Sequence, residues 1–254
     1  MTPERALLTF DLPDEQASKQ LGEDIAAALR IADVLLLSGD LGMGKSTLAR
    51  AIIRAMAGNH DLEVPSPTFT LVQAYATRVP IQHYDLYRLG APDELEELGF
   101  SEAIRDGAVL VEWPERAADD MPKDAVRLSL SERGQGRALS IDAPTDFAER
   151  LQRSLLIRRF LDNAGWQKAS RSFLVGDAST RAYESVRRSD GEAMILMNAP
   201  RRPDGPPIRD GKPYSRIAHL AESVMPFVAI ARALRDHGFT APAIPAADLD
   251  QGLL

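Results

Sequence analysis

Residues 39–46, GDLGMGKS, most constrain what this chain can fold into, because they match the P-loop pattern G-x-x-x-x-G-K-[ST]. The motif follows the apolar run VLLL at 34–37, which is typical of a buried parallel strand. It also opens a helix predicted over 46–57, which Gly58 is placed to end. Strand, glycine-rich loop and helix in this order are the context that a phosphate-binding loop requires.

Each residue type in this loop has a physical reason. Glycines let backbone N–H groups turn toward phosphate oxygens, and the start of a helix adds positive potential. Lys45 is expected to reach the β- and γ-phosphate oxygens, while the Ser46 hydroxyl is expected to bind Mg²⁺. The predicted nucleotide-binding loop consists of Gly39, Asp40, Leu41, Gly42, Met43, Gly44, Lys45, Ser46 and Thr47.

A phosphate-bound Mg²⁺ also needs carboxylate oxygens at the end of a neighbouring strand. Glu112 ends the segment AVLVE at 108–112, where four apolar residues precede the acid. Because the carboxyl ends of parallel strands line ligand sites, Glu112 is a candidate metal ligand. Asp85 ends IQHYD at 81–85, whose alternating pattern fits a metal site and a solvated strand end about equally.

Five further side chains near these strands are candidates with an ordinary alternative. The Thr68 hydroxyl, in SPT at 66–68, could meet Mg²⁺ or the γ-phosphate, although a simple turn accounts for the same residues. His83 lies inside an apolar strand and is expected to be a hydrogen-bonded histidine of the core or the surface. Tyr84, Tyr87 and Trp113 could form an aromatic surface for a partner, but packing in the core is their expected role.

Strand-like and helix-like segments alternate along the first part of the chain, which favours an α/β sheet. Strands are predicted at 69–75, 81–86, 108–112, 126–130 and 137–141, the last two as a hairpin, and helices at 14–30, 92–106 and 145–164. Asp14 is the expected cap of the first of these helices.

Charge divides the chain of 254 residues into two predicted domains, 1–150 and 151–254. The first carries 15 Lys and Arg against 26 Asp and Glu, and the second carries 15 against 11. In the second, antiparallel strands are expected at 172–175, 183–188 and 192–197, an exposed proline-rich loop at 199–213 and a helix at about 215–236.

Several classes of protein are excluded by composition. The chain has no cysteine, which rules out disulfides and thiolate metal sites, and its four histidines are scattered. No apolar run approaches the roughly 18 residues of a membrane span, and residues 1–15 do not resemble a secretory signal. We therefore expect a cytoplasmic protein that does not bind membranes.

Five segments together resemble the TsaE family, the ATPase subunit of bacterial tRNA threonylcarbamoyladenosine biosynthesis. They are GDLGMGKST at 39–47, SPTFTLV at 66–72, HYDLYRL at 83–89, DELEELGF at 93–100 and LVEWPER at 110–116. The resemblance covers roughly residues 10–142 and implies a P-loop NTPase-like sheet with flanking helices.

The resemblance implies a small ATPase that uses ATP and Mg²⁺ and works with the tRNA threonylcarbamoyltransferase subunits. It implies catalytic roles for Lys45, Asp85 and Thr68, and metal roles for Ser46, Glu112 and Asp85. Glu15 matches a family stretch near the nucleotide, and Ser46 is threonine in many members. The acidic balance of residues 1–150 would repel phosphate backbones, so tRNA is expected as an indirect partner only.

The second part resembles the N-terminal lobe of aminoglycoside-phosphotransferase-like kinases that phosphorylate N-acetylmuramate or N-acetylglucosamine. The resemblance rests on FLVGDASTRAYESV at 173–186, MILMNAP at 194–200 and the segment 226–254. It would put Gly176, Asp177, Ser179 and Arg181 over the ATP phosphates. Asn198 stands where members often have Asp, and no catalytic loop follows residue 181, so we expect a truncated α+β lobe without sugar-kinase activity.

Two other functions stay open besides an ATPase serving tRNA modification. A nucleotide-dependent regulatory module would need ATP binding but not hydrolysis. A stand-alone P-loop small-molecule kinase would need an arginine-rich lid over the transferred phosphoryl group. The arginines of 114–137 are instead spread through acidic and strand-like sequence, which disfavours the kinase.

Overall fold

The computed structural model describes residues 4–91, 93–174, 181–201, 205–213, 217 and 223–254. The chain divides into two compact units, Met1–Leu156 and Ile157–Leu254, called here the first and second unit. No helix among the described residues is long and apolar enough to cross a membrane.

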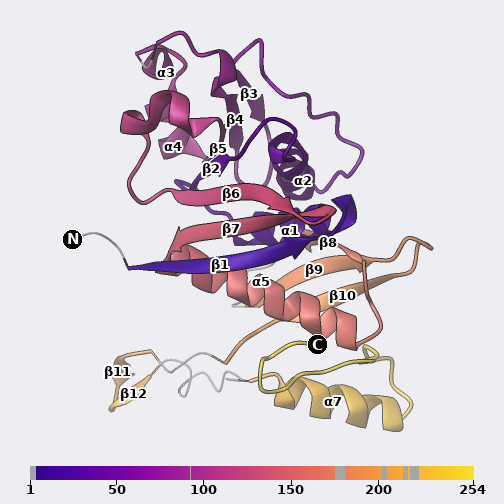
Figure 1. Ribbon diagram of the computed structural model, residues 1–254. Helices are drawn as coiled ribbons and strands as arrows, with labels where there is room; N and C mark the ends of the chain where they lie inside the picture. The colour runs from indigo at the N-terminus through magenta and orange to yellow at the C-terminus, as the bar shows by residue number, and fades with distance from the viewer. Residues whose placement is uncertain (1–3, 92, 175–180, 202–204, 214–216, 218–222) are drawn as a thin grey trace. The chain divides into compact units, whose positions relative to one another are not determined.

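The first unit contains a seven-stranded sheet with helices on both faces (Figure 1). Its elements are β1 Arg5–Leu12, α1 Glu15–Ala28, β2 Val34–Ser38, α2 Lys45–Ala57, β3 Val72–Tyr75, β4 Ile81–Asp85, η1 Leu86–Arg88, α3 Glu94–Glu97, α4 Phe100–Asp106, β5 Ala108–Glu112, η2 Pro114–Asp120, β6 Val126–Arg133, β7 Gly136–Pro144 and α5 Thr145–Asn163, which continues into the second unit. The α/β class predicted from the sequence is confirmed.

The strand order is β1-β7-β6-β2-β5-β4-β3. The four central strands β6, β2, β5 and β4 run parallel to one another, whereas β7, β1 and β3 pair antiparallel to their neighbours. The predicted hairpin is present as β6 and β7, with Arg133 opposite Gly136 across its turn. Since β2, β4 and β5 are parallel, their carboxyl ends meet at one edge of the sheet.

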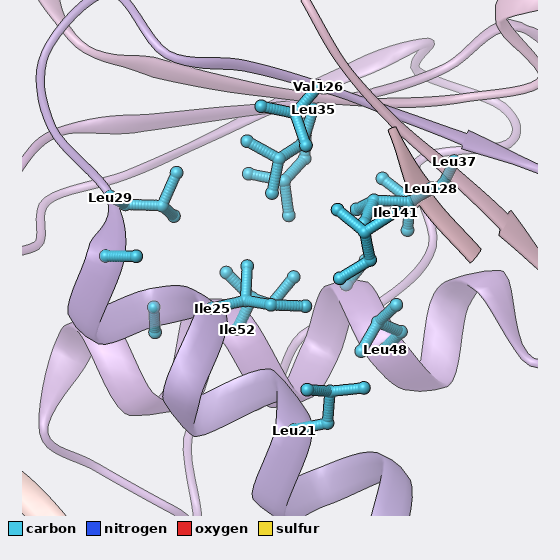
Figure 2. Close-up of a cluster of buried hydrophobic side chains, with 14 of the residues drawn as sticks. Leu21, Ile25, Leu29, Leu35, Leu37, Leu48, Ile52, Val126, Leu128 and Ile141 are labelled. Carbon is cyan, nitrogen blue, oxygen red and sulfur yellow. The ribbon is translucent and has the colours of Figure 1, made fainter. Parts of the chain in front are cut away.

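Alternation along the strands divides the buried side chains between two faces. On β2, Leu35 and Leu37 belong to the core beneath α1 and α2, whereas Val34 and Leu36 belong to the core beneath α4, η1 and η2. Figure 2 shows the first of these cores, in which side chains of α1 and α2 such as Ile25 point toward those of the strands. Such burial is the main stabilising contribution to the unit.

The N-terminal part of the first unit departs from prediction at two places. Strand β1 was not predicted, although Ala6, Leu8, Phe10 and Leu12 alternate with residues that are more exposed. Strand β3 begins at Val72 rather than at residue 69, because residues 67–71 close a turn in which the Leu71 N–H donates to the Pro67 carbonyl. The Asp14 cap is confirmed, since its carboxylate accepts from the Ala17 N–H.

The second unit contains a three-stranded antiparallel sheet in the order β10-β9-β8. Its elements are β8 Ser170–Leu174, β9 Ala182–Arg187, β10 Ala193–Asn198, β11 Pro207–Arg209, β12 Lys212–Pro213 and α7 Met225–Asp236. The predicted antiparallel strands are confirmed. The proline-rich segment is not a loop throughout, because β11 and β12 pair within it, and both are short enough to leave proline at strand ends.

Of the helix predicted at about 215–236, the structure describes α7, which begins at Met225 after the non-helical residues Ser223 and Val224. Gly176, Asp177 and Ser179, the residues that the kinase resemblance puts over phosphates, lie outside the described residues. Arg181 is described, and its guanidinium lies 5.7 Å from the ring centroid of Phe227.

Candidate nucleotide-binding site

The predicted P-loop joins the end of β2 to the start of α2, as the motif requires. Gly39 has a φ of 140°, and a Cβ on it would lie 2.6 Å from the Leu130 carbonyl oxygen on β6. Gly42 and Gly44 also have positive φ, at 82° and 99°. The loop therefore needs glycine for its backbone conformation and, at Gly39, for its close approach to β6.

The side chain of Lys45 is folded into the loop and is almost completely buried. Its Nζ donates hydrogen bonds to the carbonyl oxygens of Gly39, at 2.6 Å, and Asp40, at 3.0 Å. The same ammonium lies 3.5 Å from the centroid of a Trp113 ring. Burial lowers the pKa of Lys45 from its usual value, although Glu112 and other acids nearby favour the charged form.

Glu112 is buried at the end of β5 and its two oxygens have different partners. Oε2 accepts a hydrogen bond of 2.7 Å from the Ser46 hydroxyl, at the start of α2. Oε1 lies 2.9 Å from Nε2 of His83, and both side chains are about 1% exposed. This carboxylate therefore connects two strands to the P-loop helix.

Asp85 is buried at the end of β4 and organises the segment that precedes β3. Its Oδ2 accepts hydrogen bonds from the hydroxyls of Ser66, at 2.8 Å, and Thr68, at 2.7 Å. Its Oδ1 accepts from the Tyr87 N–H at 3.1 Å. Asp85 is thus a hydrogen-bonded buried acid, not the solvated strand end that the sequence left open.

Parallel pairing brings these groups together. Asp85 is the register partner of Glu112, and Glu112 is also the partner of Leu37 on β2. A pocket of about 220 Å³ opens at this edge of the sheet. It is lined by Leu41, Gly42, Gly44, Lys45, Ser46, Ser66, Thr68, Asp85, Tyr87, Glu112 and Trp113.

Several predicted residues lie outside this lining. Gly39 and Asp40 contribute their carbonyls to Lys45, and neither Met43 nor Thr47 lines the pocket. Glu15 is exposed at the start of α1, where it forms an ion pair of 2.9 Å with Lys19 that lowers the pKa of Glu15. It is not part of the pocket.

Two aromatic side chains have a different place from the one expected from sequence. Tyr84 is buried in the core as predicted, but Tyr87 is 42% exposed and Trp113 lines the pocket, so neither is a simple core residue. Trp113 has a φ of 59°, uncommon for a residue other than glycine, and packs beside Tyr87 at 5.1 Å between ring centroids. His83 is a buried histidine that contacts Glu112. It lies two residues before Asp85, so both side chains are on the same face of β4, as the alternating pattern of 81–85 indicates.

The donor set of the pocket fits Mg²⁺. Ser46 supplies a hydroxyl, and Glu112 and Asp85 supply carboxylates, all of which are hard oxygen donors. Among the described residues there is no group of three or more His, Cys, Asp or Glu that could hold a metal alone. Beside nucleotides, Mg²⁺ is commonly bound by one or two carboxylates together with phosphate oxygens and water, and the pocket offers two carboxylates.

Comparison with known proteins gives a consistent family. A sequence model of the family "Threonylcarbamoyl adenosine biosynthesis protein TsaE" matches residues 12–139. The crystal structure of Bacillus subtilus YdiB superposes with a TM-score of 0.50 at 25% identity, covering 59% of this chain and 97% of that one.

Curated relatives carry the name "tRNA threonylcarbamoyladenosine biosynthesis protein TsaE". The Haemophilus influenzae protein is 32% identical over 57% of this chain and 94% of its own length. The Rickettsia felis protein is 45% identical over 41% of this chain, and the match spans only 61% of that relative. The Aquifex aeolicus protein is 40% identical over 45% of this chain and 80% of its own length. The chain therefore belongs to the TsaE family.

Proposed function

We propose that this chain is an Mg²⁺-dependent ATPase that serves threonylcarbamoyladenosine modification of tRNA by acting on the transferase subunits. The observation that carries the proposal is the convergence of Lys45, Ser46, Thr68, Asp85 and Glu112 on one pocket beside the P-loop. The proposed pathway is taken from curated relatives that are named for threonylcarbamoyladenosine biosynthesis.

In this proposal Lys45 compensates negative charge on the β- and γ-phosphates, and Ser46 and Glu112 hold the metal. Bound Mg²⁺ would supply further charge neutralisation on the phosphate oxygens. In the structure the Lys45 ammonium is held by the carbonyls of Gly39 and Asp40, which phosphate oxygens would replace. Asp85 and Thr68, which are joined by a hydrogen bond, would orient the attacking water at the γ-phosphate.

The proposed partner is protein rather than tRNA. Residues 1–150 have 26 acidic against 15 basic side chains, a balance that disfavours tight binding to a phosphate backbone. ATP binding and hydrolysis would instead reset the transferase subunits between turnovers. Changes in the segment 66–68, whose hydroxyls bind Asp85 beside the pocket, would communicate the nucleotide state.

The test is multiple-turnover threonylcarbamoyl transfer to tRNA by the transferase subunits with ATP. The chain is added as wild type or as Lys45→Ala. We expect sustained turnover with the wild type and a single round or less with the variant. Equal turnover with both would overturn the proposal.

A regulatory module that needs ATP binding alone is the second candidate, favoured by the contact of Asp85 with both hydroxyls of the 66–68 segment. The variant Asp85→Asn distinguishes the two functions in the same assay. A variant that binds ATP without hydrolysing it and still sustains turnover would favour the regulatory module. Loss of turnover with binding intact would favour the ATPase.

A further inference from the structure

His83 is a buried polar residue in a strand position otherwise suited to an apolar one. It pairs in register with Leu110 on β5 and is followed two residues later by Asp85 on the same face of β4. A polar ring in such a place costs free energy unless it is hydrogen-bonded. Its partner is Glu112, through Nε2 and Oε1 at 2.9 Å.

The surroundings of the ring determine where its proton lies. Nδ1 is buried and has no hydrogen-bond partner within the described part of the chain. A proton on Nδ1 would therefore be a buried, unpaired N–H, and the lone pair of Nε2 would face a carboxylate oxygen. A proton on Nε2 instead donates to Glu112 and leaves only an unpaired acceptor at Nδ1. A ring that carries a proton on Nε2 fits these contacts.

The contact between His83 and Glu112 also affects the second carboxylate oxygen of Glu112. With Oε1 held by the ring, Oε2 stays directed at the Ser46 hydroxyl, 2.7 Å away at the start of α2. Without the ring, the carboxylate group could rotate away from the pocket, because its remaining side-chain hydrogen bond among the described residues is the one with Ser46. Ligands that bind metal are commonly oriented by such outer contacts.

We propose that His83 is a positioning residue: its Nε2–H fixes Glu112 so that one carboxylate oxygen faces Ser46 and the metal-binding side of the pocket. The inference rests on the proposed function, since it assigns Glu112 and Ser46 to Mg²⁺. His83 itself touches neither nucleotide nor metal, because it does not line the pocket.

The test compares His83→Leu, which removes the donor, with His83→Gln, whose amide nitrogen can occupy the place of Nε2. His60→Leu is the matched control, because His60 is exposed and does not line the pocket. Binding of a fluorescent ATP analogue is measured in EDTA and over a titration of Mg²⁺. A role in core packing alone would alter nucleotide binding in EDTA as well.

We expect His83→Leu to raise the half-saturating Mg²⁺ concentration by roughly 10-fold or more, as loss of an outer contact typically does. Binding in EDTA should be unchanged, and His83→Gln and His60→Leu should titrate like the wild type. A folded His83→Leu protein with wild-type Mg²⁺ dependence would overturn the inference. So would a Gln variant as impaired as the Leu variant.

A second measurement uses the unaltered chain, so it does not depend on how the variants fold. Nitrogen-15 NMR of the histidine rings should show His83 protonated at Nε2, and a ring protonated at Nδ1 alone would contradict the inference. A wild type that binds no ATP overturns the proposed function. A wild type that binds with Mg²⁺ dependence insensitive to His83→Leu overturns only the role of His83.

Discussion

Asp85 and Glu112 are register partners at the ends of the parallel strands β4 and β5, yet their described hydrogen bonds go to different parts of the site. Asp85 binds the hydroxyls of Ser66 and Thr68, whereas Glu112 binds the Ser46 hydroxyl at the start of α2. Two adjacent carboxylates thus control separate elements. Substitution of Asp85 should therefore impair ATP hydrolysis and leave ATP binding in place.

Asp85→Asn is expected to keep ATP binding and to lose hydrolysis. The amide has nearly the same shape but no charge, and its nitrogen cannot accept from the hydroxyls that Oδ2 now serves. The loss in kcat should be roughly 100-fold, as for removal of a group that aids proton transfer. Phosphate release with the transferase subunits measures hydrolysis, and calorimetry measures binding. Asp106→Asn, at an exposed site on α4, is the control, and an equal loss there would refute a specific role.

Lys45→Ala is expected to weaken ATP binding by roughly 10-fold or more, because it removes a charge-assisted hydrogen bond to phosphate. Calorimetric titration with Mg²⁺ and ATP measures the change. Lys19→Ala is the matched control, since Lys19 is half exposed on α1, where its described ion pair is with Glu15. Unchanged affinity in the Lys45 variant would contradict the assignment of the loop.

Gly39→Ala is expected to lower the free energy of unfolding by about 3 kcal/mol, because positive φ and a collision act together. The added Cβ would lie 2.6 Å from the Leu130 carbonyl oxygen, which is held in β6. At Gly58 the φ is 61° and a Cβ meets nothing within 4 Å, so Gly58→Ala should cost only about 1 kcal/mol. Urea unfolding followed by circular dichroism compares the two, and equal losses would show that the contact with β6 is unimportant.

Alkaline pH should destabilise the first unit through Tyr84. Burial, aided by the negative charges of Glu102 and Glu96, raises the pKa of Tyr84 to about 12 from 10.0. The folded state therefore keeps a proton that the unfolded state releases, so stability is full below pH 10 and falls between pH 10 and 12. At pH 11 the effect should be about 1 kcal/mol.

The variant Tyr84→Phe isolates this contribution. It loses the hydrogen bond of 3.1 Å from the Tyr84 hydroxyl to the Leu98 carbonyl, a cost that does not depend on pH below 10. The difference in unfolding free energy between wild type and variant should then shrink from pH 9 to pH 11. A constant difference over this range would refute the shifted pKa.

Local patterns predicted the elements whose causes lie close together in the sequence. The segment from β2 through the P-loop to α2 follows from an apolar run, glycines and a helix that Gly58 ends. Strand β1 was missed because its pairing with β7, as of Arg5 with Pro144, joins residues far apart in the chain. Strand β3 is short because a turn at 67–71 precedes it, and the apolar residues in that segment had suggested a strand there instead.

The site was predictable in its residue types but not in its contacts. Glu112 and Asp85 were identifiable as acids at strand ends, and their position side by side follows only from strand order and register. The hydrogen bond between His83 and Glu112 depends on the same register, whereas the one from Ser66 to Asp85 depends on the conformation of the segment before β3. Glu15 was assigned through resemblance alone, and it lies outside the pocket lining.

The division between the two units falls inside α5, between Leu156 and Ile157, and not in a connecting loop. Proteases cut extended chain, so junctions between domains are usually their first targets. Here the peptide bonds at the junction are helical, and a protease can reach them only where α5 unravels. A cut after residue 150, where the sequence analysis places the domain boundary, would also separate Leu151 from the core in which it is fully buried. Native digestion should therefore begin elsewhere and leave the junction intact.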